Sequence, residues 1–363
     1  MTLLQIMLKS LTKIIELNGK RLMNFKISRI LKLAAVIIVM IIAAYCFLSI
    51  NKCTQRSIFA MDTYMEITVY GWNSKKAADK AIDEICRLED MLSTEKTDSE
   101  IARINQTKSI NISDETAYLI SKSNEISKST QGAFDITIYP VMRAWGFGSG
   151  EYRVPDLVEI KELIKSVDYT KIEYDEANHK LSIPDEVEID FGGIAKGYTS
   201  DKVAEVMQQY GIKSAILNLG GNVKAVGSKV DGSKWKVAVK SPCDSAQYMG
   251  ILSANDTCVI TSGGYERFFE KNGKKYHHII DPDTGLPADS GLISVTVVCN
   301  DGTKADALST ALFIMGNEKA QEYWRKHKTE FDMILMDSNE HIYVTEGIED
   351  DFESQYYSVE IIK

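Results

Sequence analysis

Hydrophobic side chains alternate with polar ones along some short segments of the chain and recur at helical spacing along others. Residues 63–70 place Met65, Ile67 and Val69 at every second position, which predicts a strand with one buried face. Residues 75–93 place Ala78, Ile82 and Ile85 three or four positions apart, which predicts a helix. On the same grounds we expect further helices at 114–128, 158–166, 195–210, 305–315 and 317–327. We expect strands at 170–174, 179–183, 213–219, 234–240, 257–261, 275–281, 292–299, 331–336 and 341–345.

The order of these elements indicates an α+β fold. Neighbouring strands joined by short turns, such as 170–174 and 179–183, and the run of strands late in the chain favour a largely antiparallel sheet flanked by helices over a doubly wound sheet. No low-complexity linker or internal repeat divides residues 54–363. We therefore expect these residues to form a single unit, and the pattern leaves open whether that unit is bilobal.

A long apolar segment near the N-terminus predicts a membrane anchor. Residues 33–50 carry no charged side chain and are just long enough to cross a bilayer as a helix. Lys26, Arg29 and Lys32 precede this run, so the positive-inside rule places the N-terminus in the cytoplasm and residues 54–363 on the far side. Because no small-residue cleavage site follows the run, we favour an uncleaved anchor within residues 1–53 over a cleaved signal peptide or a lipoprotein.

Charge and composition exclude several classes of protein. The chain has 363 residues, of which 44% are hydrophobic and 26% charged, as in ordinary globular proteins and unlike disordered or collagenous ones. Residues 1–53 carry a net charge of +7, whereas the whole chain carries −9, so the remaining residues carry −16. So acidic a body argues against nucleic-acid binding. The cysteines of the body, at positions 86, 243, 258 and 299, have no C-x-x-C spacing, which argues against zinc and leaves disulfides undecided.

Three glycine pairs interrupt apolar segments. They are Gly192-Gly193, Gly220-Gly221 and Gly263-Gly264. Glycine lets the backbone approach a ligand closely, although each pair alone is more typical of a tight turn or bulge. The first pair leads into the helix expected at 195–210, whose N-terminal amides favour a phosphate, and Lys196 would add a positive charge there. No Walker A or G-x-G-x-x-G spacing is present.

Two further segments carry candidate chemistry. A helix through 305–315 places Asp306 and Thr310 one turn apart on the same face, where their oxygens could hold Mg²⁺. The alternative is that Asp306 caps the helix and Thr310 bonds a backbone carbonyl. His277 and His278 end the strand expected at 275–281, and only one of them can face a site. A neutral imidazole there suits a general base, although a surface histidine is the simpler interpretation.

Taken together, these segments resemble the ApbE family of flavin transferases, which attach FMN from FAD to a Thr or Ser of a target protein. The matching stretches follow the family's order and span nearly all of 61–315: 61–63, 92–94, 99–105, 132–140, 145–148, 190–197, 218–222, 261–263, 278–285 and 305–310. The resemblance implies an ApbE-type flavin transferase domain over residues 54–363, in the extracytoplasmic space at the bacterial cell membrane.

The resemblance also implies roles for individual residues. Asp306 and Thr310 would bind Mg²⁺ with a main-chain oxygen of Gly193, while His278 would deprotonate the acceptor hydroxyl. Lys196 and the Gly192 and Gly193 amides would support the phosphate oxygens. The FAD would lie along Met61, Ala133, Phe134, Asp135, Asp190, Lys196 and Ile279. Two positions depart from the family's usual pattern, because Asp62 stands where Gly is usual and Glu95 where a Tyr that contacts the ligand is usual.

The implied reaction is Mg²⁺-dependent transfer of FMN from FAD, with release of AMP. By resemblance, the acceptor is a secreted flavoprotein or electron-transfer subunit that carries an Asp-Gly-x-Thr/Ser type motif. Two alternatives stay open. Water in place of the acceptor would make the protein an FAD pyrophosphatase that releases FMN and AMP. A membrane-tethered protein that binds FAD without catalysis is the second, although simple FAD retention does not require a metal.

Overall fold

The computed structural model describes residues 12–13, 15–17, 29, 32–33, 36–40, 51–244 and 247–363. It divides into two units, Met1–Lys52 and Cys53–Lys363. The run 33–50, which we expect to be a membrane anchor, lies largely outside the described residues. Across the residues that are described, no helix combines the length and the apolar character needed to span a bilayer. The elements that surround the candidate site all belong to Cys53–Lys363.

The helices and strands of this unit alternate irregularly along the chain. The α-helices are α2 (Ser74–Leu92), α3 (Glu100–Thr107), α4 (Asp114–Ser129), α5 (Tyr139–Trp145), α6 (Leu157–Leu163), α7 (Ala195–Gln209), α8 (Gly302–Met315) and α9 (Asn317–Lys326). The short 3-10 helices are η1 (Ile136–Ile138), η2 (Ile164–Ser166), η3 (Tyr169–Lys171) and η4 (Glu346–Asp351). The strands are β1 (Cys53–Ala60), β2 (Thr63–Tyr70), β3 (Ser109–Asn111), β4 (Glu173–Asp175), β5 (Lys180–Ser182), β6 (Ser214–Leu219), β7 (Asn222–Gly227), β8 (Trp235–Lys240), β9 (Tyr248–Ala254), β10 (Cys258–Gly263), β11 (Phe268–Lys271), β12 (Lys274–His277), β13 (Leu292–Cys299), β14 (Asp332–Asp337), β15 (Ile342–Thr345), β16 (Phe352–Glu353) and β17 (Val359–Ile362).

A large sheet organises the unit. Within the described residues it has nine strands in the order β1-β2-β6-β7-β10-β13-β14-β15-β17. Every neighbouring pair is antiparallel except β15 and β17, which run parallel. Smaller sheets have the orders β16-β9-β8 and β3-β5-β4, and β11 pairs with β12. The expected α+β fold with a largely antiparallel sheet and flanking helices is therefore confirmed.

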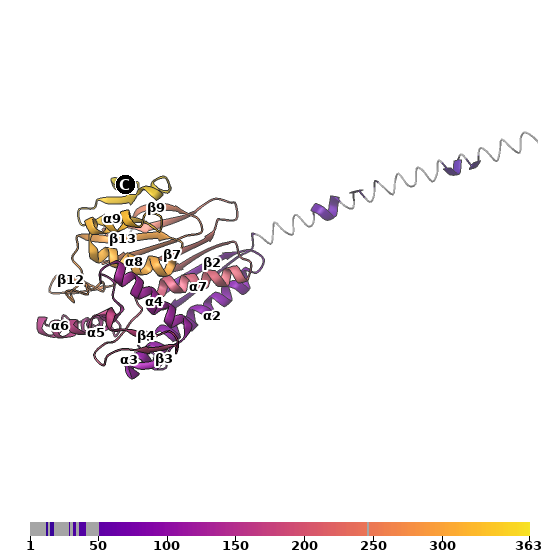
Figure 1. The fold of residues 1–363 in the computed structure, drawn as a ribbon. Helices are drawn as coiled ribbons and strands as arrows, with labels where there is room; N and C mark the ends of the chain where they lie inside the picture. Colours follow the sequence, from indigo (N-terminus) through magenta and orange to yellow (C-terminus); the bar gives the residue numbers. More distant parts are fainter. Residues whose placement is uncertain are drawn as a thin grey trace, which may run out of the picture. The chain divides into compact units, whose positions relative to one another are not determined.

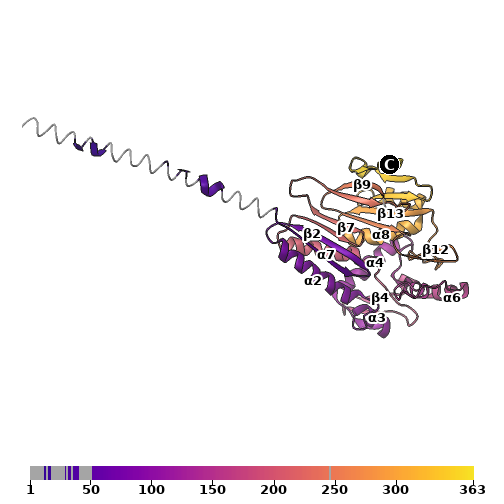
Figure 2. The same cartoon turned by 180° about the vertical axis from the view of Figure 1, so that it is seen from behind.

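Two layers cover the large sheet. On one face, buried side chains of α2 and α7, such as Ile85 and Val203, pack with those of β2 and β6, and α8 packs over β10 and β13. On the other face, β8 and β9 bury Trp235, Val237 and Leu252 against the C-terminal half of the sheet. Figure 1 shows α2, α7 and α8 running along the sheet. In the view from behind, the β11–β12 hairpin and α6 project on the same side of the fold (Figure 2).

Most of the long elements lie where the hydrophobic pattern predicts them. β2 and β13 match their expected bounds, 63–70 and 292–299, and α2, α4, α7 and α9 each agree to within one residue at either end. α8 begins at Gly302, three residues before the expected start, because the Asp301 side chain accepts a hydrogen bond from Lys304 N and caps the helix. The alternative in which Asp306 caps this helix is therefore wrong.

Two expected strands are wrong in part. The segment 170–174 begins as a 3-10 turn, because Asp168 Oδ1 accepts a hydrogen bond from Thr170 N and holds Tyr169–Lys171 in that turn. The strand expected at 275–281 ends at His277, beyond which the chain turns through Asp281 to Gly285. The predicted elements also omit several that the structure contains: β1, β3, β7, β9, β11, β16, β17, α3 and α5.

A close contact between α7 and α8 fixes the geometry of the site. A Cβ added to Gly197 would lie 2.0 Å from the Gly302 carbonyl oxygen and 2.6 Å from Asp306 Cβ. No residue with a side chain could therefore occupy position 197 while the two helices keep this separation. In addition, Asp201 of α7 accepts hydrogen bonds from the α8 amides Gly302 N, at 3.0 Å, and Thr303 N, at 2.8 Å.

We predict that Gly197→Ala lowers the free energy of unfolding by about 1–3 kcal/mol, because the new methyl group forces the packed helices apart. Urea unfolding followed by circular dichroism measures the change. Gln208→Ala, at an exposed position of the same helix, is the matched control and should change stability by less than about 0.5 kcal/mol. A Gly197→Ala variant as stable as the parent would show that the helices do not approach this closely.

Candidate active site

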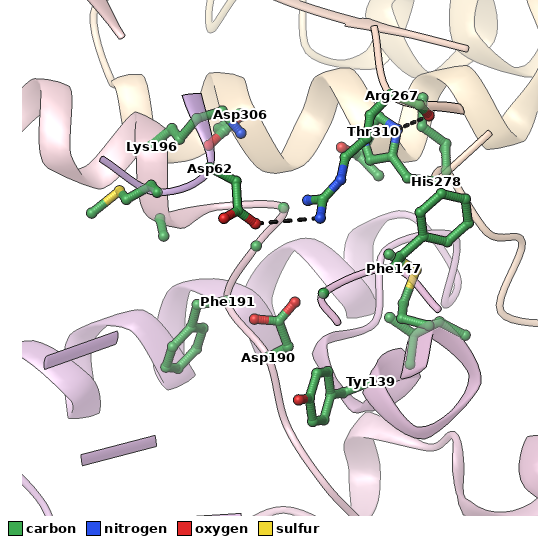
Figure 3. Close-up of a pocket in the computed structure, with 18 of the residues that line it drawn as sticks. Asp62, Tyr139, Phe147, Asp190, Phe191, Lys196, Arg267, His278, Asp306 and Thr310 are labelled. Carbon is green, nitrogen blue, oxygen red and sulfur yellow. Dashed lines mark hydrogen bonds and ion pairs between the residues drawn. The ribbon is translucent and has the colours of Figure 1, made fainter. Parts of the chain in front are cut away.

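A cavity of about 780 Å³ opens beside the α7–α8 contact. Its wall comes from the β1–β2 and β6–β7 turns, the end of β10, the start of α7 and one face of α8. The structure brings every residue nominated from the sequence to this cavity: Met61, Ala133, Phe134, Asp135, Asp190, Gly192, Gly193, Lys196, His278, Ile279, Asp306 and Thr310. Figure 3 shows ten of the lining residues by name, among them Asp190, Lys196, Asp306 and Thr310.

Asp306 is buried at the centre of the α7–α8 contact. Its side chain is 4% exposed, and a carboxylate at such depth needs hydrogen-bond donors. Oδ2 accepts a hydrogen bond from Gly197 N at 2.8 Å, and Oδ1 accepts one from Asn222 Nδ2 at 2.9 Å. These two donors fix the orientation of the carboxylate and leave one further lone pair on each oxygen.

Hydroxyl groups extend the oxygen-rich surface from Asp306. Thr310 lies one turn further along α8, and its Oγ1 is 3.3 Å from Ser262 Oγ on β10. Ser262 Oγ is in turn 2.7 Å from Ser309 Oγ. In the described part of the chain no three His, Cys, Asp or Glu side chains gather as a metal-binding group. A cation bound here would therefore meet one carboxylate together with hydroxyl and main-chain oxygens, a donor set that fits Mg²⁺ with substrate phosphates completing its shell.

The Asp190–Lys196 turn forms the adjoining wall. Burial raises the pKa of Asp190, while the Gly192 and Phe191 amides and the charges of Lys196 and Arg267 act in the opposite direction. A Cβ at Gly192 would lie 2.7 Å from Asp190 Oδ2, so a side chain there would displace the Asp190 carboxylate. Within the described residues, Lys196 forms no ion pair. The amide of Gly197, near the start of α7, donates its hydrogen bond to Asp306. It is therefore not available to bind a phosphate, unlike what the sequence predicts for the first amides of this helix.

Of the two adjacent histidines, His278 faces the cavity. His278 Nδ1 lies 3.1 Å from the Arg267 carbonyl oxygen, which can only accept, so Nδ1 carries the proton and Nε2 has the lone pair of the neutral ring. Burial, the Lys196 charge and the Arg267 charge lower the pKa of His278 to about 3. His277 packs edge-on against Phe313 and does not line the cavity, as strand geometry predicts for neighbouring residues.

Phe134 and Asp135 form a further part of the cavity wall. Gly193 lies close to the Phe134 ring, since a Cβ there would be 3.0 Å from Cε2. Asp135 reaches the cavity, but Oδ1 accepts hydrogen bonds from Thr137 N and Oγ1, and Oδ2 accepts one from Tyr169 N. Its carboxylate therefore holds the local chain together. Glu95 also lines the cavity, together with the aromatic side chains Tyr139, Phe147 and Tyr152.

Acidic side chains outnumber basic ones around the cavity. The described carboxylates in the wall belong to Asp62, Glu89, Glu95, Asp135, Asp190, Glu266 and Asp306, and the cations to Lys96, Lys196 and Arg267. Lys96 is already paired with Glu89 at 3.0 Å and with Asp90 at 2.7 Å. A ligand with two negative charges would therefore be repelled unless a metal ion entered with it or the carboxylates were neutralised.

Several residues of the cavity wall are not among the candidates that the sequence indicates. Asn222 and Ser262 sit in the glycine-pair segments that the sequence singles out, so their position beside a ligand could have been inferred. Arg267 and Glu266 have no such signal, because they follow the Gly263-Gly264 pair in a stretch without recognisable periodicity. Glu89 was missed because it belongs to a regular amphipathic helix, where an exposed acid is ordinary. It accepts a hydrogen bond from Met61 N at 2.7 Å.

We predict that the His278 ring stays neutral from pH 8 to pH 5, below the ordinary histidine pKa near 6.5. Because its pKa is lower in the folded than in the unfolded chain, its contribution to stability is present above pH 6.5 and is lost as the pH falls toward 3. Histidine-selective NMR measures the titration, and His278→Ala identifies the signal. A midpoint near 6.5 would contradict the buried, Arg267-bound geometry.

Comparisons with known proteins agree with one another. Residues 61–335 match the ApbE family. A FAD:protein FMN transferase from Haemophilus influenzae is 33% identical over 68% of this chain and 75% of its own length, and one from Klebsiella pneumoniae is 31% identical over 81% and 92%. A crystal structure of an ApbE protein from Thermotoga maritima superposes with a TM-score of 0.78 at 30% identity, covering 83% of this chain and 99% of that one. The Pseudomonas stutzeri flavinyl transferase ApbE gives 0.74 at 26% identity, covering 84% and 98%.

Proposed function

The chain belongs to the ApbE family of flavin-transferring enzymes, and from that membership we propose that it transfers FMN from FAD to a Thr or Ser hydroxyl of a target protein, with release of AMP. The observation that carries the proposal is the buried Asp306 carboxylate, held by Gly197 and Asn222 and followed one turn later by Thr310 in a cavity that also contains Lys196 and His278. This is an arrangement suited to a diphosphate and a divalent cation.

Mg²⁺ is the cation that these residues fit. Asp306 and Thr310, with the main-chain oxygen of Gly193, would hold it against the diphosphate of FAD. When bound, Mg²⁺ would neutralise the negative charge that collects on the phosphate oxygens. The proposal also accounts for the excess of carboxylates in the cavity wall, because a metal ion would offset a charge that otherwise repels FAD.

The chain's own side chains would perform the remaining tasks. Lys196 and the Gly192 and Gly193 amides would support the non-bridging oxygens of the phosphate that is transferred. His278 would accept the proton of the acceptor hydroxyl at Nε2, since its Nδ1 proton is held by the Arg267 carbonyl. The acceptor oxygen forms a bond to the phosphorus on the FMN side, the bond from that phosphorus to the bridging oxygen breaks, and AMP leaves with that oxygen.

The direct test combines full-length protein, FAD, Mg²⁺ and a candidate acceptor bearing an Asp-Gly-x-Thr type motif. Mass spectrometry of the acceptor and chromatography of AMP are the two readouts. Equal yields of FMN-modified acceptor and AMP support transfer, and an acceptor with Ala in place of the Thr should stay unmodified. FMN and AMP without modified acceptor would indicate a pyrophosphatase, and unchanged FAD would indicate a binding protein.

We predict that Asp306→Ala lowers the rate of transfer at least about 100-fold, because the cation loses its carboxylate ligand and with it several kcal/mol of transition-state stabilisation. The rate is measured as AMP released in the presence of acceptor. Asp350→Ala is the control, because Asp350 is exposed and does not line the cavity. Its rate of transfer should equal that of the parent. An Asp306→Ala rate equal to that of the parent at the same Mg²⁺ concentration would contradict the assignment of this ligand.

We predict that His278→Ala slows transfer by about 10²–10⁴-fold while the dissociation constant for FAD changes less than about threefold, because the imidazole acts on the acceptor proton. Single-turnover transfer and an FAD titration give the two quantities. His341→Ala, at an exposed position, provides the matched control. An unaltered rate would exclude His278 as the base.

We further propose that residues 33–50 anchor the protein in the bacterial cell membrane and that Cys53–Lys363 lies outside the cytoplasm. A covalently attached FMN would be retained there, where a dissociable flavin would be lost, and the acceptors would be secreted flavoproteins or electron-transfer subunits. The apolar run and the preceding basic residues support this location. Digestion of intact cells with added protease tests it, because resistance of the whole chain would place the domain on the inner side.

A further inference from the structure

Arg267 lies between two parts of the site that are far apart in the sequence. Its main-chain oxygen is 3.1 Å from both N and Nδ1 of His278. Its guanidinium reaches across the cavity, where Nη2 is 3.3 Å from Asp62 Oδ2 (Figure 3). The backbone of Arg267 is thus tied to the histidine, whereas its long side chain can change partner without moving that backbone.

Asp62 occupies an unusual backbone conformation. It forms the two-residue β1–β2 turn with Met61, and both residues have positive φ, 49° at Met61 and 59° at Asp62. Neither residue is glycine, so the turn is strained, and such strain persists where surrounding contacts impose it. Here Met61 N donates to Glu89 Oε1 at 2.7 Å, and the Met61 sulfur lies 3.7 Å from Thr199 Oγ1. These contacts hold Asp62 at the edge of the cavity.

The pair formed by Asp62 and Arg267 is easily exchanged. The Asp62 side chain is 63% exposed and the Arg267 side chain 37% exposed, and ion pairs so open to water contribute little free energy. If the guanidinium turned to another anion, Asp62 would remain hydrated and lose little.

A diphosphate is the anion best placed to replace Asp62. Arginine binds phosphate through two parallel N–H donors, and such charge-assisted pairs are stronger inside a cavity than on a surface. The charge of Arg267 already acts on both Asp190 and His278, so the guanidinium lies near the proposed position of the reacting phosphate. The described cations that line the cavity are Lys96, Lys196 and Arg267. Lys96 is already paired with Glu89 and Asp90, which leaves Lys196 and Arg267 to meet a phosphate.

We propose that Arg267 is a ligand of the FAD diphosphate and that Asp62 is its partner in the empty site, so that FAD binding exchanges one salt bridge for another. This inference rests on the proposed function, because it takes FAD as the substrate. In this exchange Asp62 competes with the substrate for Arg267.

The test measures dissociation constants for FAD and for riboflavin, which lacks phosphate, with full-length protein in the presence of Mg²⁺. Arg267→Gln should weaken FAD binding at least tenfold and change riboflavin binding less than twofold. Arg267→Lys, which keeps the charge but loses the two-pronged geometry, should show a smaller loss. Arg56→Gln is the matched control, because Arg56 pairs with Asp79 at 2.8 Å with similar exposure but does not line the cavity.

Asp62→Asn is the second variant for the same FAD-binding measurement. It should tighten FAD binding two- to fivefold in the parent protein and have no effect when Arg267→Gln is already present. FAD affinity within twofold of the parent in Arg267→Gln would overturn the proposal, and so would an equal effect of Asp62→Asn in both backgrounds. Should Arg267→Gln fail to fold, Arg267→Lys and Asp62→Asn decide the question alone. If the parent protein does not bind FAD, the proposed function fails instead.

Discussion

The site depends on the approach of α7 to α8 at Gly197. Because position 197 has no side chain, the α8 backbone at Gly302 comes close enough for Gly197 N to donate to the Asp306 carboxylate. Asp201, one turn further along α7, binds the first amides of α8 and fixes the register of the two helices. The start of α7 and the face of α8 that carries Asp306 and Thr310 are thereby held side by side by direct contacts between the two helices.

Electrostatics then determine what this element can bind. Buried carboxylates are unfavourable without donors or cations, and the structure answers that cost differently at each position. Asp306 accepts two hydrogen bonds and Asp135 accepts three. The Asp135 bonds hold the local chain together, whereas Asp306 lies beside the Thr310 and Ser262 hydroxyls in the cavity wall. This distribution favours a ligand that brings its own cation.

The hydrophobic pattern predicts the long helices and strands better than the short or weakly patterned ones. β2 alternates along its length and α2 has a clear apolar face, so their bounds follow from the sequence. β1 was missed because CTQRSIFA has a weak pattern and becomes half-buried only at the edge of the sheet. α3 and α5 are eight and seven residues long, so each has only a few apolar positions from which helical spacing could be recognised. The candidate cavity residues belong to motifs that the sequence shows. Arg267 belongs to none of these motifs, and only the fold brings its side chain next to Asp62.

The central claim is tested most directly by the coupling between Mg²⁺ binding and FAD binding in the full-length parent protein. Calorimetric titration measures the affinity for each ligand with and without the other. If the Asp306–Thr310 face holds a cation against the diphosphate, Mg²⁺ should tighten FAD binding at least tenfold, and FAD should tighten Mg²⁺ binding by the same factor. An FAD affinity that is the same with Mg²⁺ and with a chelator would contradict the account.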